Sequence, residues 1–346
     1  MEITPEFDSF IRNFFKQRRK IVIIPHLNPD GDALGATQAL FSYYKKQGHR
    51  VWVISPDAPQ ETFHWMPGFN EIIIANQDLE KAKQTFEEAE VLFCLDFGSA
   101  ARAGILENLI TESSQPSINI DHHLDSAHFT TYRLHDVKAC STCELVYRFI
   151  LYQNGRITPE VATCIYTGIL TDTGSFRFRN VTPEVHRIVA ELIEKGAQTD
   201  LVHNKIYYSN TVEKTRFMGY CLYERLKILP QLHTAYITVP LSLQQDMNYR
   251  VGDTQGLVML TLSLKNINLG IVLVENEELI RMSFRSVGSF AANKLAARFN
   301  GGGHYNAAGA KSYSSLEETE KQLLAVLEEY KQELDYEIYD QVVFFV

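Results

Sequence analysis

Acidic and histidine side chains gather at places where apolar runs of the sequence end. His26, Asp30 and Asp32 lie in the heptapeptide His-Leu-Asn-Pro-Asp-Gly-Asp, soon after the run Ile21–Ile24. The proline and glycine of this heptapeptide favour a turn, so the three side chains can converge instead of alternating across a strand. An imidazole with two carboxylates suits Mn²⁺, Mg²⁺ or Zn²⁺, and the carboxylates favour the harder ions. The alternative is an Asp-Gly turn whose acids are simply solvated.

Three further groups follow other apolar runs. Asp96 comes directly after one, where a charge is costly unless it meets a cation, although Asp96 alone also fits a helix N-cap. Asp121, His122 and His123 come after another and combine metal-ligand with proton-transfer groups, with a plain loop as the alternative. Asp172 follows a mainly apolar helical segment, where the helix dipole disfavours a carboxylate unless a cation compensates it. Taken alone, Asp172 also fits a turn.

Together the four groups supply enough imidazoles and carboxylates for two metal ions that share a bridging carboxylate. Two ions at ~3.5–4 Å can hold a bridging hydroxide and stabilise the attacking and leaving oxygens of a phosphoryl displacement. The combination therefore predicts a two-metal phosphoryl-transfer site.

Strands and helices alternate in the first half of the chain. Apolar, β-branched runs predict strands at 21–24, 51–55, 71–75, 91–95 and 117–120. Helices are expected at 5–19, 33–47, 158–170 and 182–195, three of them opened by Thr-Pro-Glu. This alternation predicts an α/β fold with a doubly wound, mainly parallel sheet. Ligands bind beyond the carboxyl ends of such strands, so the four groups are expected at one edge.

The second half predicts a smaller, mixed α/β domain of about 115 residues. We expect a connector at 196–228 with a helix over 211–229, then strands at 233–239, 267–275 and 279–286. Helices are expected at 256–264, 290–300 and 316–334. The predicted division is therefore 1–195, 196–228 and 229–346.

This half also contains residues that could bind an anion. Arg285 and Ser286 stand at a predicted strand end, and Gly301, Gly302 and Gly303 precede His304. Glycines let backbone N–H groups approach an anion closely, and the histidine can donate to a phosphate oxygen. A glycine-rich helix stop is the alternative.

Charge and composition limit the partners. Lys and Arg total 33 against 42 Asp and Glu, a formal charge of −9, which excludes a broad basic face for long nucleic acid. No secretory signal and no apolar run of ~18 residues is seen, so no membrane is expected. Five sparse cysteines fit reduced thiols in the cytoplasm. Cys140 and Cys143 overlap a helix-capping box of Ser141 and Glu144, so no redox or zinc role is expected for them.

In combination these motifs resemble the DHH phosphoesterase superfamily, whose name matches Asp121-His122-His123. The second half resembles the DHHA1 domain, and among the branches the chain looks most like the stand-alone two-domain nanoRNases. These are oligoribonucleases and phosphatases of 3′-phosphoadenosine-5′-phosphate (pAp). The motifs that carry the resemblance are His26–Asp32, Asp96, Asp121–His123, Asp172, Arg285-Ser286 and Gly301–His304.

The resemblance implies a role for each metal ligand. One Mn²⁺ would be held by His26, Asp30 and Asp96. The other would be held by Asp32, Asp96, His122 and Asp172, so that Asp96 bridges the pair. Mg²⁺ or Co²⁺ would be alternatives to Mn²⁺.

The resemblance also implies roles beyond the metals. His123 would contact the scissile phosphate or assist proton transfer, and Asp121 would orient a histidine. Arg285 and His304 would grip the substrate across a cleft between the domains. The substrate-binding set would be Arg285, Ser286, Gly301, Gly302, Gly303 and His304.

The activity implied is hydrolysis of short oligoribonucleotides to mononucleotides and of pAp to AMP, by hydroxide attack at two Mn²⁺ ions. A phosphodiesterase of cyclic or linear dinucleotides is the close rival, and an inactive nucleotide-binding regulator is the alternative from another class. A family II pyrophosphatase is disfavoured because the basic Ser-Arg-Lys-Lys-Gln segment is absent. A processive exonuclease would need a basic groove. A homodimer would be unsurprising for the family.

Overall fold

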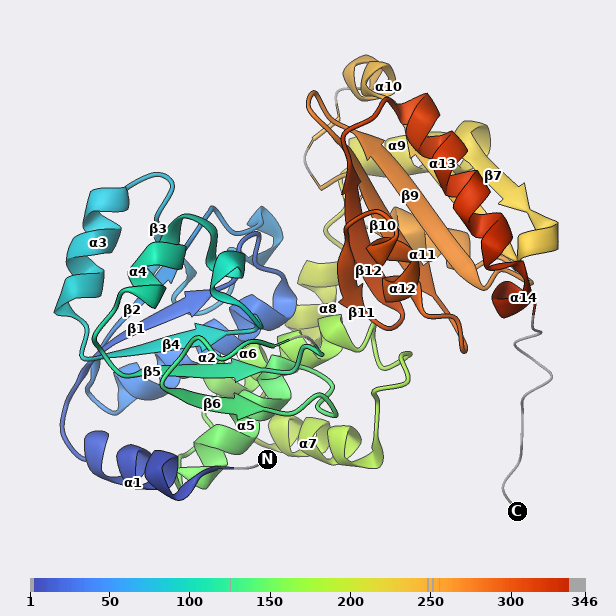
Figure 1. Cartoon of the computed structure of the whole chain (residues 1–346). Helices are drawn as coiled ribbons and strands as arrows, with labels where there is room; N and C mark the ends of the chain where they lie inside the picture. The colour runs from blue at the N-terminus through green and yellow to red at the C-terminus, as the bar shows by residue number, and fades with distance from the viewer. Residues whose placement is uncertain (1–2, 125, 248, 251, 255, 336–346) are drawn as a thin grey trace. The chain divides into compact units, whose positions relative to one another are not determined.

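The computed structural model describes residues 3–124, 126–247, 249–250, 252–254 and 256–335. The chain forms two compact units, Met1–Ser209 and Asn210–Val346, each with its own sheet (Figure 1). The boundary between the units falls within the segment 196–228, where the sequence places a connector. The finer division at 195/196 and 228/229 stays a prediction.

The first unit holds a six-stranded parallel sheet in the order β3-β2-β1-β4-β5-β6. This is the doubly wound arrangement that the sequence predicts, and the order reverses between the neighbours β1 and β4. The strands are β1 (Lys20–Pro25), β2 (Arg50–Ser55), β3 (Ile73–Ile74), β4 (Val91–Leu95), β5 (Ser117–Asp121) and β6 (Tyr132–His135).

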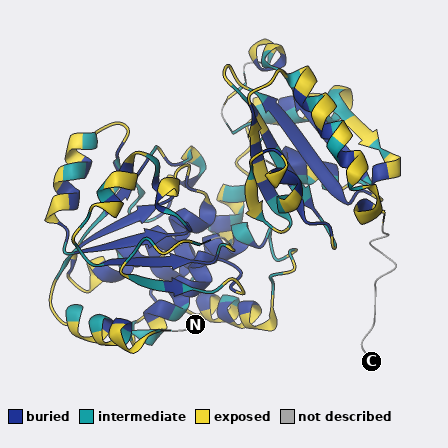
Figure 2. Ribbon diagram, viewed as in Figure 1, coloured by how far each residue is buried: buried dark blue, intermediate teal, exposed yellow. Residues whose placement is uncertain are grey.

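Helices cover both faces of this sheet, and the central strands are buried between them (Figure 2). Ile21 and Ile23 of β1 pack into one apolar cluster while Val22 and Ile24 pack into another, and all four are inaccessible to solvent. The helices are α1 (Pro5–Phe14), α2 (Gly31–Lys46), α3 (Leu79–Glu88), α4 (Glu107–Thr111), α5 (Thr142–Tyr152), α6 (Pro159–Asp172), α7 (Pro183–Glu194) and α8 (Thr199–Tyr207). Short 3₁₀ turns lie at Glu61–Phe63, Phe69–Glu71 and Ala100–Leu106.

The Thr-Pro-Glu signals mark helix starts as predicted, with proline in the first turn of α1, α6 and α7. The first helix was predicted to run to residue 19. This prediction is wrong, because α1 ends at Phe14. There the Arg19 Nε–H donates to the Phe14 carbonyl at 2.9 Å, and the Arg19 backbone N–H donates to His49 Nδ1 at 3.0 Å. Arg19 thus caps the helix from outside instead of extending it.

The second unit holds a mixed six-stranded sheet in the order β11-β12-β10-β9-β8-β7, in which β8 and β9 are parallel and the other pairs antiparallel. The strands are β7 (Leu226–Leu229), β8 (Thr234–Val239), β9 (Leu269–Glu275), β10 (Ile280–Ser286), β11 (Gly302–His304) and β12 (Ala307–Ser312). The helices are α9 (Val212–Tyr220), α10 (Leu241–Asp246), α11 (Leu257–Leu262), α12 (Ala292–Ala297), α13 (Leu316–Glu329) and α14 (Lys331–Leu334).

Two expectations for this unit are wrong. The helix expected over 211–229 ends at Tyr220, and after a π turn the residues Leu226–Leu229 pair with β8 as an edge strand. The glycines do not stop a helix either, since α12 ends at Ala297 and Gly302–His304 pairs with β12 as β11. A side chain at Gly301 would place its Cβ 2.2 Å from the Gly309 carbonyl, so the pairing itself requires glycine there.

Among the residues that the structure describes, no helix is long and apolar enough to cross a membrane.

Candidate metal centre

The first unit brings the predicted ligands to the carboxyl edge of its sheet. His26 directly follows β1, Asp96 directly follows β4, and Asp121 is the last residue of β5. These strands are neighbours in the sheet, and the strand order reverses between β1 and β4. In doubly wound sheets this reversal opens the ligand crevice. The topology therefore gathers residues that are far apart in the sequence.

Helix starts supply two more carboxylates. Asp30 is the N-cap of α2, and its Oδ1 accepts the N–H groups of Asp32 and Ala33 at 3.0 and 3.1 Å. Asp32 lies in the first turn of α2 and is buried. Its two oxygens accept the N–H groups of Thr142 at 2.6 Å and Cys143 at 2.9 Å, at the start of α5. The positive end of α5 thus holds the Asp32 carboxylate in place.

His122 and Asp172 complete the centre. Asp172 is the last residue of α6, two residues beyond the predicted helix end. His122 Nε2 lies 3.5 Å from Asp172 Oδ2, 3.8 Å from Asp32 Oδ2 and 3.7 Å from Asp96 Oδ1. One imidazole nitrogen therefore faces three carboxylates.

Asp96 presents its two oxygens to different histidines. Its Oδ2 lies 3.5 Å from His26 Nε2, whereas its Oδ1 lies 3.7 Å from His122 Nε2 and 3.8 Å from His123 Nδ1. The potential ligand atoms of His26, Asp30 and Asp96 lie within 4.8 Å of one another, as do those of Asp96, His122 and His123. Asp96 is thus common to two groups of ligands.

Hydrogen bonds fix which nitrogen each histidine offers. Nδ1 of His26 lies 2.8 Å from the Leu27 carbonyl, and Nδ1 of His122 lies 3.2 Å from the Ala139 carbonyl. A carbonyl only accepts, so each Nδ1 carries a proton, and in the neutral imidazole each Nε2 keeps its lone pair. The two Nε2 atoms are the nitrogens that face the carboxylates. A metal-binding histidine is usually held in this way, with its other ring N–H donating to a carbonyl or a carboxylate.

The separations fit ions better than direct hydrogen bonds. Two ligand atoms that each lie about 2.1 Å from one ion at 90–110° are about 3.0–3.4 Å apart, close to the 3.5–3.8 Å between His122 and its three carboxylates. Burial and the charges of Asp96 and Asp172 raise the pKa of Asp32 well above its ordinary value. Burial also opposes ionisation of Asp96, but the interactions with His26, His123 and His122 lower its pKa below the ordinary value. Repulsion among the carboxylates, the donor types and the spacing all fit divalent cations.

His123 has a different environment. Its Nδ1 lies 2.7 Å from Asp121 Oδ1, and its carbonyl accepts a hydrogen bond from His135 Nε2 at 2.7 Å. Burial lowers the pKa of His123, but the hydrogen bond to Asp121 and the charge of Asp96 outweigh it and raise the pKa to about 9. The side chain is 26% exposed, so it lies between the buried cluster and solvent.

The sequence did not point to three residues that support the centre. Thr142 donates from its N–H to Asp32 and from its hydroxyl to Asp96 Oδ1 at 2.7 Å. Asn119 bonds to the backbone on both sides of Asp96. A Cβ at Gly168 would lie 2.2 Å from Cys143 Sγ and 2.7 Å from Asp32 Oδ1, so glycine there allows α6 to approach α5 and Asp32. Ser141 caps α5 as expected by accepting from the Glu144 N–H, whereas the Glu144 carboxylate accepts from the Cys140 N–H, one residue before the cap. This motif was the available signal for the start of α5.

The predicted substrate-binding residues lie in the second unit. Arg285 of β10 and His304 of β11 both pair with Ala307 of β12, so the three stand in one row and share a face of the sheet. Ser286 is buried, with its hydroxyl donating to the Phe290 carbonyl at 2.7 Å and accepting from Asn306 Nδ2 at 2.9 Å. Its hydroxyl thus holds the turn after β10. Gly302 and Gly303 are exposed on β11, and Gly301 directly precedes that strand.

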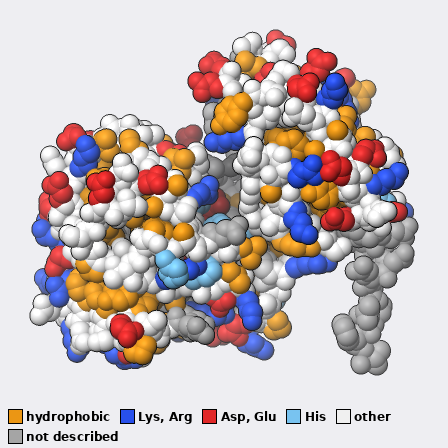
Figure 3. Space-filling model, viewed as in Figure 1, with side chains coloured by type: hydrophobic (Ala, Val, Ile, Leu, Met, Phe, Trp, Pro, Cys, Tyr) orange, Lys and Arg blue, Asp and Glu red, His pale blue; other side chains and the backbone are white. Residues whose placement is uncertain are grey.

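Charged side chains of both signs are interspersed on the face of each unit shown in Figure 3. Over the described residues drawn there, no broad basic area forms.

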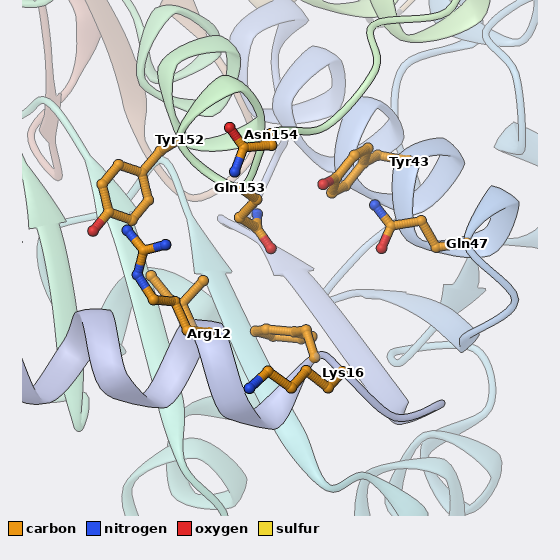
Figure 4. Close-up of a pocket in the computed structure, with 9 residues that line it drawn as sticks. Arg12, Lys16, Tyr43, Gln47, Tyr152, Gln153 and Asn154 are labelled. Atoms are coloured by element: carbon orange, nitrogen blue, oxygen red, sulfur yellow. The ribbon is translucent and has the colours of Figure 1, made fainter.

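A separate cavity of about 430 Å³ lies where α1, α2 and α5 end (Figure 4). The first turns of α2 and α5 carry Asp32 and Thr142, so this cavity lies at the opposite ends of those helices. Its cations are engaged, since Arg12 pairs with Asp8 at 2.6 Å and Lys16 donates to Asn13 at 3.1 Å. We assign this cavity no role.

Comparison with known proteins agrees with this architecture. The model of the DHH family N-terminal domain matches residues 20–169, and that of the DHHA1 domain matches residues 233–333. The chain therefore belongs to the DHH family, with a DHHA1 domain as its second part.

Relatives of similar length indicate which class of enzyme the chain belongs to. The bifunctional oligoribonuclease and PAP phosphatase NrnA of Thermus thermophilus is 30% identical over 314 residues, which is 89% of this chain and 90% of that protein. The protein of the same name from Bacillus subtilis is 25% identical over 301 residues, 85% and 90% of the two chains. The crystal structure of an exopolyphosphatase-related protein from Bacteroides fragilis is 37% identical, with a TM-score of 0.90 over 95% and 98%. The chain is accordingly a hydrolase of the phosphoesterase class.

Proposed function

We propose that the protein is a Mn²⁺-dependent phosphohydrolase that degrades short oligoribonucleotides to mononucleotides and converts pAp to AMP and phosphate. The observation that carries the proposal is Asp96, whose two oxygens face two different histidines as a bridging carboxylate requires. The names of the T. thermophilus and B. subtilis relatives, which match nearly the full chain, support this substrate class.

In this proposal His26, Asp30 and Asp96 hold one ion and Asp32, Asp96, His122 and Asp172 hold the other. Bound there, two divalent ions would activate a water and compensate the charge that develops on the phosphate oxygens. The helix start of α5 holds Asp32, and the Leu27 and Ala139 carbonyls fix the histidine tautomers. Mg²⁺ and Co²⁺ suit the same donors and are the alternatives to Mn²⁺.

His123 is proposed to contact the scissile phosphate or to move a proton. Its side chain lies between the buried cluster and solvent, so the ring is placed to donate to an oxygen of a phosphate bound at the cluster. Asp121 holds His123 through Nδ1. In the second unit, Arg285 and His304 are proposed to bind another part of the substrate, with Ser286 and Gly301–Gly303 shaping the backbone beside them.

Two other functions are retained as alternatives. A phosphodiesterase acting on cyclic or linear dinucleotides would use the same centre on a closely related substrate. An inactive regulator would bind nucleotides without turnover. Homodimer formation and a cytoplasmic location belong to the proposal as well; all five cysteines are free and buried, which fits a reducing compartment.

The test is a substrate panel at fixed Mn²⁺, with initial rates for a diribonucleotide, pAp, linear pGpG and a cyclic dinucleotide. We expect the diribonucleotide and pAp to be hydrolysed with Mn²⁺ and not with chelator. A cyclic or linear dinucleotide turned over much faster than both would favour the first alternative. Tight pAp binding without turnover under any metal condition would favour the second.

Asp96→Ala tests the bridging role directly. We expect activity to fall by at least about 100-fold, because both ions lose a shared ligand. Asp78→Ala is the matched control, since Asp78 caps α3 in the same unit and lies outside the cluster. Full activity in Asp96→Ala would refute the two-ion assignment.

A further inference from the structure

Asp96 adopts a backbone conformation that a residue with a side chain seldom takes. Its φ is +67°, in the left-handed region, directly after β4. Only 2% of the residue is exposed, so solvent does not compensate this conformation. Strain of this kind persists only where the surroundings enforce it.

Asn119 bridges the chain on both sides of Asp96. It lies on the neighbouring strand β5 and is inaccessible to solvent. Its Nδ2 donates to the Cys94 carbonyl at 3.1 Å and to the Phe97 carbonyl at 3.0 Å. The two hydrogens of one amide group thus span the left-handed turn, which a hydroxyl with its single hydrogen cannot do.

Thr142 acts on the other end of Asp96, the carboxylate. Its hydroxyl donates to Asp96 Oδ1 at 2.7 Å in a site closed to solvent. The backbone N–H of Thr142 bonds to Asp32 at the same time, so the hydroxyl is held at a fixed place. This bond sets the rotation of the carboxylate, with Oδ1 toward His122 and Oδ2 toward His26.

We propose that Asn119 and Thr142 are positioning residues that together fix Asp96 as the bridge between two ion positions. Asn119 holds the backbone of Asp96, and Thr142 holds its carboxylate. The inference rests on the two-ion site of the proposed function. It explains why Asp96 has the backbone and carboxylate orientation that a bridging ligand needs. Neither residue is proposed to touch substrate.

Mn²⁺ binding to the full chain tests this without relying on turnover. We expect Thr142→Val to weaken binding of at least one Mn²⁺ by about 10- to 100-fold in a calorimetric titration, as for other residues that orient metal ligands. We also expect loss of the spin-coupled signal that a Mn²⁺ pair gives in electron paramagnetic resonance. Thr142→Ser keeps the hydroxyl and should restore both. Asn119→Ala should weaken binding to a similar degree.

Matched variants separate positioning from general damage. Thr85→Val removes a buried hydroxyl that donates to the Lys81 carbonyl within α3, and Asn268→Ala removes a buried amide in the second unit. Both should keep wild-type Mn²⁺ binding. Thermal unfolding in chelator shows whether each variant folds, and Thr142→Ala replaces Thr142→Val if the latter does not.

An Asp96→Ala background shows whether the hydroxyl acts through Asp96. There Thr142→Val should cause no further loss of Mn²⁺ affinity. Folded Thr142→Val and Thr142→Ala with affinity within twofold of wild type, or an equal loss with and without Asp96, would overturn the inference. Wild-type protein that binds no Mn²⁺ pair would instead refute the proposed function.

Discussion

His123 is the histidine of the cluster that solvent reaches most easily, with 26% of its side chain exposed against 6% for His26 and 4% for His122. Its pKa of about 9 exceeds the value of about 6.5 expected in the unfolded chain. The folded, metal-free protein therefore binds this proton more tightly, and the bound proton stabilises the fold. The stabilisation is complete below about pH 6.5 and is lost as the pH rises through about 9.

This predicts a difference between wild type and His123→Gln in chelator. Between about pH 6 and about pH 9 the free energy of unfolding should fall further in wild type than in His123→Gln. The difference between the two decreases should be on the order of 2 kcal/mol. Urea unfolding at several pH values measures it, with His64→Gln as a control histidine exposed in the same unit. If the free energy of unfolding depends on pH in the same way in wild type and His123→Gln, then Asp121 does not stabilise a proton on His123.

The clustering of the proposed ligands at one edge of the sheet could be predicted, because each stands where an apolar run ends. Their supporting residues could not, since Thr142 bonds to Asp96 across 46 residues and Asn119 clamps carbonyls more than 20 residues earlier. The expected alternative for Asp96, a helix N-cap, is wrong because the next helical turn begins at Ala100 after Ser99. Asp30 is an N-cap and also faces His26, so the turn interpretation and the ligand interpretation both apply to it.

Helix packing gives a prediction at the scale of elements. Gly168→Ala would push a methyl group against Cys143 Sγ and the Asp32 carboxylate, at the place where α6 meets α5 and α2. We expect a loss of about 1–3 kcal/mol in the free energy of unfolding and weaker Mn²⁺ binding, because Asp32 must move. Gly219→Ala is the control, since no atom of the described residues lies within 4 Å of its added carbon in α9, and it should stabilise by up to about 1 kcal/mol. Equal effects of the two changes would contradict the close-packing role of Gly168.

Elements were predictable where local signals agree with the fold. The buried strand at 21–24 and the Thr-Pro-Glu helix starts are of this kind. The edge strand β3 falls within the strand predicted at 71–75, but the edge strands β6, β7 and β11 were not predicted, because pairing with a distant neighbour makes them strands. Tyr132–His135 has one fully buried residue, Leu134, and Leu226–Leu229 has none, so neither shows the pattern of a central strand. The glycine-rich β11 likewise exists through its register with β12.

At the scale of the whole molecule, ion binding should stabilise one unit more than the other. The proposed metal ligands all lie in the first unit, so Mn²⁺ at 100 times its dissociation constant adds about 2.7 kcal/mol to the stability of the state that binds it. Hydrogen exchange with and without Mn²⁺ should show greater protection in α2, α5 and α6 and a smaller change in β8 and β9. Increased protection confined to the second unit would place the ions elsewhere.

The formal charge of −9 predicts how the protein treats substrates of different length. Four of its negative charges are Asp30, Asp32, Asp96 and Asp172, which two divalent ions would balance, so the site can attract phosphate while the rest of the surface remains acidic. A short substrate then makes one or two phosphate contacts, and the affinity should follow salt with a logarithmic slope of about −0.7 to −1.4. Between about 50 and about 200 mM salt, kcat/KM for a diribonucleotide should fall about three- to sevenfold.

An oligoribonucleotide of about twenty residues should compete only weakly at both salt concentrations, because a protein without a broad basic face gains little from its additional phosphates. Strong competition by the long strand, or a slope steeper than about −3, would show a basic track along the protein and would exclude a site limited to a few nucleotides.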